Sequence, residues 1–147
     1  MSALNVLLLC GNLSYAGAQR QMFELAKGLN RRHNVIACSI GSKNSLLQEF
    51  IKNEILVEVL NLRVRNFIQI LVLLSSIIKK NKIEVIYSFL DTANYFARLI
   101  KLFLPYIKIV VSERSSNNKT SIRNKFFEKV FSKRTDLYIA NSYAGQL

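Results

Sequence analysis

Several residue types are scarce in this 147-residue chain, and each scarcity excludes a class of protein. The sequence has 1 proline, 5 glycines, 2 cysteines and 1 histidine, and it has no tryptophan. So little proline and glycine in a sequence that is 50% hydrophobic excludes a collagen-like or disordered chain. Cys10 and Cys38 are too few for a disulfide framework, and with His33 they offer too few ligands for a metal site. We therefore expect reduced cysteines in the core, no metal and no cofactor.

Long hydrophobic runs are missing as well. The longest uncharged apolar stretch, residues 67–78, has 12 residues, whereas a bilayer needs roughly 20. The N-terminal run 3–10 has neither a basic flank nor a cleavage pattern, so it is predicted to be a strand and not a secretion signal. These features predict a cytoplasmic protein. The length of the chain predicts a single domain.

Acidic residues are also few, which leaves the chain strongly basic. Lysine and arginine number 21 against 9 acids, giving a net charge of +12. Such an excess indicates a polyanion, an anionic membrane surface or a phosphorylated ligand, and a basic solubilising surface is the plain alternative. The charge also favours a nucleic-acid binder. However, no helix-turn-helix, zinc or RNA-binding pattern is visible, so no nucleic-acid partner is expected.

What the chain has in abundance is alternation between apolar runs and helix-periodic segments. Strands are predicted at residues 5–10, 35–40, 55–60, 84–89, 108–112 and 137–140. The first of them is a short continuous apolar run, typical of a strand covered on both faces. Segments with apolar residues at intervals of three and four predict helices at residues 18–29, 46–52, 67–80, 92–104 and 121–131. Strands separated by helices indicate right-handed crossovers. The sequence therefore predicts an α/β, Rossmann-like open sheet of about six mainly parallel strands, with helices on both faces.

The loop at residues 11–20, GNLSYAGAQR, joins the first predicted strand to the first helix. The start of that helix presents free backbone N–H groups and a positive dipole end at the carboxyl edge of the sheet, where open α/β sheets bind anionic ligands. The G-x-G-x-x-G spacing of dinucleotide-binding loops is absent. Because Gly17 and Ala18 lie at the start of the helix, they are candidate ligand contacts. A tight strand-to-helix turn is the alternative role for Gly17.

Four stretches resemble one known family. The segment from Ala16, AGAQRQMFELAKGL, resembles the G-G-A-E-R…L-A-x-x-L segment that opens family-four, retaining glycosyltransferases of the GT-B fold. In the family's order there follow EVIYSF at 84–89, which resembles D-V-V-H-x-H, and DLYIANS at 136–142, which resembles A-D-x-x-I-x-x-S. Between them, IVVSERS at 109–115 resembles the V-V-x-S-E-R-N variant of enzymes that build surface polysaccharide and glycolipid. Gln19 replaces the family's usual acid, and Phe89 stands where many members have histidine.

The resemblance implies the N-terminal, acceptor-side domain of a glycosyltransferase. Such an enzyme moves a sugar from a nucleotide-sugar donor to a lipid-linked or polysaccharide acceptor, with retention at the anomeric carbon. Its chemistry takes place between two domains, where basic groups and backbone N–H donors stabilise the leaving diphosphate. We expect residues 1–147 to be the first domain, without the C-terminal nucleotide-sugar-binding domain, and therefore to be inactive alone. A non-catalytic interaction domain on the same scaffold is the alternative.

Three further residues are candidates for the substrate site. Glu113 and Arg114 directly follow the fifth predicted strand, so their side chains are expected at the carboxyl edge of the sheet. An arginine fork binds phosphate or sugar hydroxyls, and a nearby carboxylate orients it; a structural ion pair is the alternative. This pair gives the best candidates for catalysis. Asp91 follows the fourth strand, where it either binds acceptor hydroxyls or, more simply, caps the next helix.

Residues 119–134 carry six basic residues and one acid. The basic residues are Lys119, Arg123, Lys125, Lys129, Lys133 and Arg134. Aromatic and aliphatic residues share the other face of the predicted helix. We predict that this helix lies on an anionic leaflet, which places the protein peripherally on the inner face of the plasma membrane. The alternative is a core-facing helix whose polar side is basic.

Overall fold

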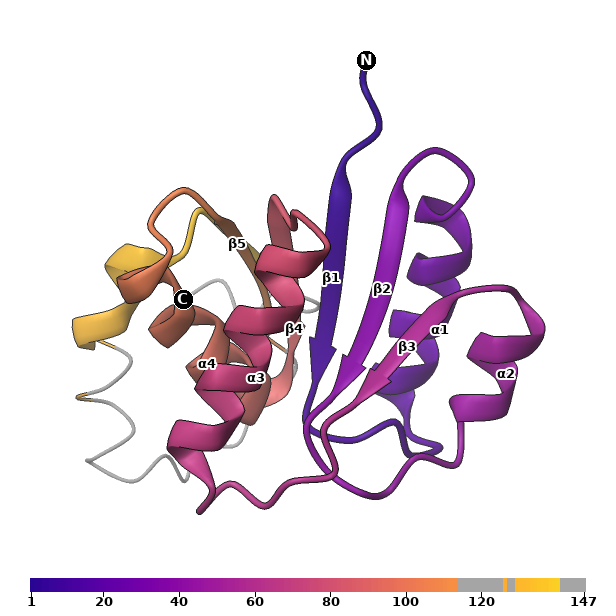
Figure 1. The fold of residues 1–147 in the computed structure, drawn as a ribbon, viewed down its shortest axis with the longest axis horizontal. Coiled ribbons are helices and arrows are strands. Elements are labelled where there is room, and N and C mark those ends of the chain that lie inside the picture. Colours follow the sequence, from indigo (N-terminus) through magenta and orange to yellow (C-terminus); the bar gives the residue numbers. More distant parts are fainter. Residues whose placement is uncertain (114–125, 127–128, 141–147) are drawn as a thin grey trace.

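The computed structural model describes residues 1–113, 126 and 129–140 (Figure 1). Its elements, in chain order, are β1 (Asn5–Cys10), α1 (Gly17–Leu29), β2 (Asn34–Ser39), α2 (Leu47–Lys52), β3 (Leu56–Val59), α3 (Phe67–Lys80), β4 (Val85–Phe89), α4 (Leu90–Phe103), β5 (Lys108–Glu113), a 3₁₀-helix η1 (Ser132–Arg134) and β6 (Leu137–Ala140). The strands form one sheet in the order β3-β2-β1-β4-β5-β6, and every pairing is parallel. The predicted Rossmann-like open sheet is confirmed.

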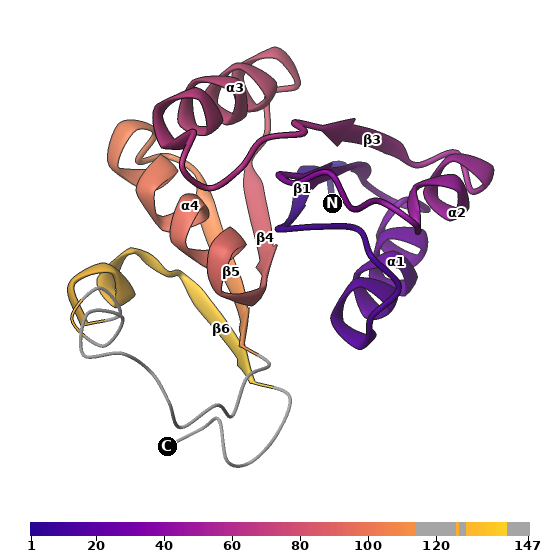
Figure 2. The ribbon, with the colours of Figure 1, turned by 90° about the horizontal axis from the view of Figure 1, so that it is seen from below.

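Helices cover both faces of the sheet, α1 and α2 on one side and α3 and α4 on the other (Figure 2). The side chains of β1 alternate between these two layers. Leu7 and Leu9 join the cluster that contains α3 and α4, whereas Val6 and Leu8 join the cluster that contains α1 and α2. Because neither face meets water, the strand needs no polar alternation, which explains its continuous apolar run.

Cys10 and Cys38 are both buried and unpaired, as predicted. Burial raises the pKa of the Cys10 thiol to about 12 and that of Cys38 also well above its usual range. Both sulfurs therefore stay protonated at neutral pH. They act as small apolar core groups and not as nucleophiles.

Polar contacts with α4 and β5 attach the segment that contains the last strand. The Asp136 carboxylate accepts hydrogen bonds from the backbone N–H of Ile109 (2.8 Å) and from Lys101. Burial acts to raise the pKa of Asp136, but these hydrogen bonds outweigh it and hold the pKa below its usual value. Arg98, 3% exposed, donates to the side-chain oxygens of Thr135 and Tyr138.

The α3 helix ends in a Schellman motif that turns the chain into β4. The N–H of Lys82 donates to the carbonyl of Lys79 (3.3 Å), and the N–H of Ile83 donates to the carbonyl of Ile78 (2.9 Å). Lys82 takes the left-handed conformation that the motif requires, with φ of 51°. Glu54 ends α2 in the same way, with φ of 56°. Glycine usually fills this position because a Cβ is strained there.

Replacing either residue by glycine should therefore stabilise the fold. We expect Lys82→Gly and Glu54→Gly each to raise the free energy of unfolding by about 0.5–1 kcal/mol, since relief of left-handed strain exceeds the added chain entropy. Lys80→Gly is the matched control in the last helical turn and should lower it by about 1 kcal/mol. Urea unfolding measures all three. Equal destabilisation by Lys82→Gly and Lys80→Gly would contradict the expectation.

Candidate ligand site at the carboxyl edge of the sheet

The sheet reverses its winding direction at β1. The chain passes from β1 outward to β2 and β3, then returns across β1 to β4, so β1 pairs with β2 on one side and β4 on the other. From the carboxyl ends of β1 and β4 the chain turns toward opposite layers, into α1 and α4, which opens a crevice at that edge. A hollow of about 340 Å³ lies there. It is lined by Gly11, Asn12, Gln19, Leu90, Asp91 and Thr92.

Gln19 is the most informative residue of this hollow. Its side chain lies in the first turn of α1 and is 6% exposed, yet its Oε1 atom has no hydrogen-bond partner among the described residues. A buried carbonyl oxygen without a donor costs about 1–3 kcal/mol, so native proteins rarely leave one unsatisfied. A ligand in the hollow would satisfy this oxygen by donating a hydrogen bond to it, for example from a hydroxyl group.

The first turn of α1 contributes backbone donors beside Gln19. The residue before the helix, Ala16, has no side-chain oxygen to cap it. Gly17 is exposed and Ala18 half-buried, and a Cβ built on Gly17 would meet no atom within 4 Å. Neither packing nor backbone conformation therefore requires glycine at this position. The uncapped N–H groups and the helix dipole favour an anion here.

The opposite wall of the hollow comes from the start of α4. This helix begins at Leu90, directly after β4 and without a loop, and Leu90 has φ of 70°. A bulky residue in the left-handed region is strained, and such strain is concentrated at functional sites. Below it, the Ser88 hydroxyl donates to Asn94 Oδ1 at 2.7 Å, with both residues buried. This bond ties the end of β4 to the second turn of α4.

Asp91 is exposed at the rim of the hollow, in the first turn of α4. The prediction that it caps the helix is wrong. The residue at the cap position is Phe89, and no side chain caps the helix there. Because α4 starts two residues earlier than its apolar pattern indicates, Asp91 lies inside the helix. Its carboxylate is left to interact with the α4 dipole and with whatever occupies the hollow.

The loop after β2 braces the loop after β1. Gly41 donates its N–H to the carbonyl of Gly11 at 2.7 Å, and a Cβ on Gly41 would lie 2.2 Å from Asn12 Oδ1. Asn44 Oδ1 accepts from the Ser39 hydroxyl (2.7 Å) and from the N–H of Leu13 (3.3 Å). These contacts fix the path of the β1–α1 loop, so one wall of the hollow is preformed.

The structure brings together some predicted site residues and not others. Gly17, Ala18 and Asp91 lie at or beside the hollow, and Gln19 joins them although it was singled out only as a departure from the family pattern. Glu113 ends β5 at the same edge of the sheet, but its side chain lies outside the described residues. Arg114 lies outside them entirely, so the roles given to this pair remain predictions.

The predicted membrane helix is described only in part. Lys119, Arg123 and Lys125 lie outside the described residues. Phe126 and residues 129–131 are helical, Lys129 and Lys133 are exposed, and the Arg134 guanidinium lies 5.1 Å from the centre of the Phe131 ring. Phe126 is 65% exposed and Val130 is 42% exposed.

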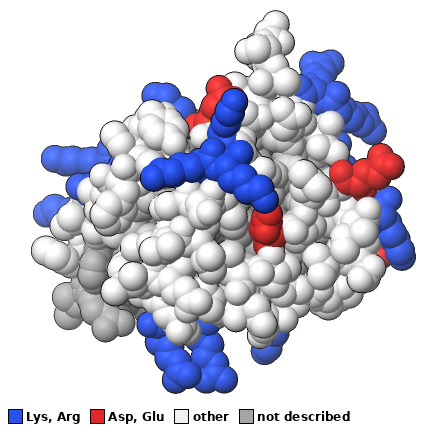
Figure 3. Space-filling view, viewed as in Figure 1, with Lys and Arg blue, Asp and Glu red and all other residues white. Residues whose placement is uncertain are grey.

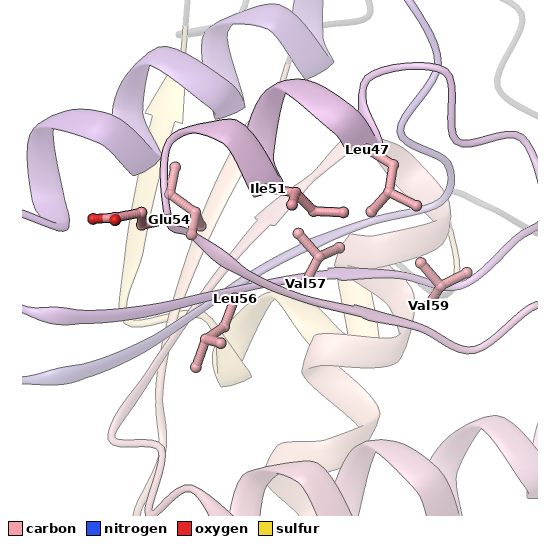
Figure 4. A pocket seen from close by; sticks show the side chains of 7 residues that line it. Leu47, Ile51, Glu54, Leu56, Val57 and Val59 are labelled. Carbon is pink, nitrogen blue, oxygen red and sulfur yellow. The ribbon is translucent and has the colours of Figure 1, made fainter.

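A second hollow lies between α2 and the edge strand β3. Figure 4 shows Leu47 and Ile51 of α2 beside Val57 of β3, while Leu56 points the other way. Its lining is aliphatic apart from Glu54. Ligand sites bring several polar groups together around an apolar lining. This hollow lacks that convergence, so we place the ligand site in the crevice beside β1.

Comparison with known proteins agrees with the fold and with the sequence motifs. The family model of Glycosyltransferase Family 4 matches residues 15–145. The chain belongs to this family. Among curated protein sequences, none matches the chain.

Solved structures show the same fold at low sequence identity. A glycosyltransferase from Rickettsia africae ESF-5 superposes with a TM-score of 0.72 at 20% identity, over 95% of this chain and 37% of that one. MurG from Acinetobacter baumannii gives 0.75 at 10% identity, over 96% and 42%. A UDP-GlcNAc 2-epimerase from Neisseria meningitidis, bound to UDP-GlcNAc, gives 0.67 at 14%, over 93% and 40%. This family-4 chain therefore spans about two fifths of the length of these structures.

The unpartnered oxygen of Gln19 leads to a test by stability alone. Gln19→Leu removes a buried carbonyl that has no donor, so the free energy of unfolding should stay the same or rise by up to about 1 kcal/mol. Asn94→Leu is the control, since it removes an amide that accepts a buried hydrogen bond, and it should cost about 1–3 kcal/mol. Urea unfolding compares the two. If Gln19→Leu lowered the free energy of unfolding as much as Asn94→Leu, Gln19 would have a structural role and not a ligand-binding one.

Proposed function

We propose that this family-4 chain is the acceptor-side half of a GT-B glycosyltransferase. The whole enzyme transfers a sugar, of the hexose type, from a nucleotide-sugar donor to a lipid-linked or polysaccharide acceptor with retention. The observation that carries the proposal is the crevice beside β1, where an unpartnered buried acceptor meets an uncapped helix start in a chain of this family.

The start of α1 suits the diphosphate of the donor. The open space before Gly17 admits a ligand to the backbone, and uncapped N–H groups with the positive dipole end favour its negative charge. As charge builds up on the leaving diphosphate, these donors need no reorganisation, which is how preorganised sites lower a barrier. We assign no metal to this role.

The remaining groups suit a hydroxylated acceptor. Gln19 Oε1 accepts a hydrogen bond from a sugar hydroxyl, and the Asp91 carboxylate at the rim accepts another. We assign Glu113 and Arg114, which follow β5 in sequence, to the same side of the substrate and to catalysis. In this assignment Arg114 binds two oxygens of the substrate at once, and Glu113 orients it.

The similar structures are consistent with a two-domain enzyme. One is a glycosyltransferase, one is MurG, and one is an epimerase with UDP-GlcNAc bound, and this chain covers only 37–42% of each. We infer that a second domain binds the nucleotide and that residues 1–147 alone transfer no sugar. The strongly basic charge supports a cytoplasmic position on the inner face of the plasma membrane, where lipid-linked acceptors are found.

A transfer assay with sugar-labelled nucleotide donors tests the proposal. Residues 1–147 alone should give no product, whereas the same residues joined to a nucleotide-sugar-binding domain of the family should transfer sugar. In the joined protein, Gln19→Leu and Gly17→Ala should each lower kcat/KM by about tenfold or more, since a transition-state hydrogen bond or a close backbone approach is lost. Proton NMR of the anomeric centre of the product reports retention or inversion.

Gly28→Ala is the matched control for Gly17→Ala. Gly28 lies in the same helix, and a Cβ there also meets no atom within 4 Å, but it is far along the helix from the crevice. The Gly28→Ala variant should leave sugar transfer unchanged and raise the free energy of unfolding by about 0.5–1 kcal/mol. Transfer by residues 1–147 alone would refute the division of roles, and full activity of Gln19→Leu would refute the site.

Arg114 is tested by a conservative change in the joined protein. Arg114→Lys keeps the charge but removes the planar fork, so kcat should fall while the thermal midpoint stays constant. If Arg114 only tethers its loop, the midpoint should fall and kcat should persist. Measuring both quantities on one variant separates the two roles.

A further inference from the structure

The outward side of α3 is unusual for a helix of a globular protein. Its inward residues, Ile70, Leu74 and Ile78, are buried against the sheet and α4. On the outward side, Ile68 is 75% exposed and Val72 61% exposed. Charged or polar residues are expected at such positions, because apolar side chains there gain nothing from folding. Contiguous exposed apolar residues mark an interaction site.

Basic residues lie at both ends of this helix. Arg63 and Arg65 precede it, and Lys79, Lys80 and Lys82 lie in and just after its last turn; all five are exposed. The sequence from residue 61 to residue 83 contains no acid. In Figure 3, where α3 faces the viewer, lysines and arginines gather above and below a broad surface made mostly of uncharged residues, and acidic side chains lie beside the upper group only.

We propose that this surface, which we name the α3 face, docks on an anionic lipid leaflet. It consists of the apolar residues Val64, Ile68, Val72 and Leu73 and of the basic residues Arg63, Arg65, Lys79, Lys80 and Lys82. Its 14 helical residues extend for about 20 Å, so the basic groups at the two ends meet separate lipid headgroups. The apolar residues between them enter the boundary of headgroups and acyl chains.

The distribution of charge on the α3 face favours a lipid leaflet over a second copy of this chain as its partner. A leaflet offers negative charge at every point around an apolar layer, which matches an apolar stripe with cations at both ends. A second copy of this chain would bring its own cations against them, and like charges oppose such a contact. Among the helices that the structure describes, none combines the length and the hydropathy that a bilayer span requires.

Docking through α3 would also orient the ligand crevice. Because the strands are parallel, α3 begins at the carboxyl edge of the sheet, the edge at which the hollow beside β1 lies (Figure 1). The inference rests on the proposed function only in supposing a membrane-linked acceptor. Binding to lipid itself requires neither donor nor acceptor.

Cosedimentation of residues 1–147 with vesicles tests the proposal. Vesicles of phosphatidylcholine with one quarter phosphatidylglycerol should bind the chain at least about tenfold more tightly than phosphatidylcholine alone, and binding should weaken with added salt. Ile68→Gln/Val72→Gln should lower the partition coefficient about tenfold. Ile51→Gln/Val59→Gln, which changes two exposed aliphatic residues of α2 and β3 on the α1 and α2 side of the sheet, should not change it.

A second pair of variants separates local from total charge. Arg63→Gln/Arg65→Gln and Arg31→Gln/Arg32→Gln remove the same number of charges from exposed sites. The first should lower binding about tenfold, and the second by less than about threefold, since only the first lies on the α3 face.

Three outcomes would overturn the proposal. They are equal binding to neutral and anionic vesicles, wild-type binding by the α3 variants, and a lipid-free dimer that Ile68→Gln/Val72→Gln dissociates. Circular dichroism confirms that each variant is folded. Because the vesicle assay contains no nucleotide sugar, its failure and the failure of the transfer assay are independent.

Discussion

The pairing of β1 with both β2 and β4 is the constraint on which the rest of the structure depends. Residues Leu7 to Cys10 are fully buried between two helical layers, and each contributes to the core on one side or the other. Since β1 is central, the chain must leave it in one direction and return in the other. This reversal sends the chain from β1 and β4 into opposite helical layers and opens the crevice. The ligand site is thus a consequence of strand order.

The sequence predicts the elements well because the central strands are covered on both faces. Continuous apolar runs separated by helical periods leave little choice other than a parallel α/β sheet. The start of α4 was placed too late for a physical reason. Leu90 enters the helix in a left-handed conformation directly after β4, which no apolar pattern signals. The misplaced boundary made Asp91 look like a cap.

The sequence identifies the β1–α1 loop as a candidate site, but it does not identify Gln19 as the main ligand-binding residue there. Gly17 stands out because it lacks a Cβ where the first strand turns into the first helix, whereas Gln19 is an ordinary helix residue until the fold buries its oxygen. The apolar residues of α3 show the opposite case. A segment apolar nearly all round is expected to be buried, yet within the part of the chain that the structure describes, one side of α3 is left exposed. Whether one side of a helix is buried depends on the elements that pack against it, and the local sequence pattern does not specify them.

The two cysteines have a consequence for oxidation. Cys10 and Cys38 lie on adjacent strands, and the Cys10 sulfur is 3.6 Å from the carbonyl oxygen of Cys38. Their side chains nevertheless belong to opposite layers, because the register pairs Cys10 with Ser39 and Leu9 with Cys38. A disulfide requires both Cβ atoms on one side of the sheet. Oxidants therefore cannot crosslink this core without first unfolding it, and a cysteine introduced on the surface would be the group that a thiol label reaches.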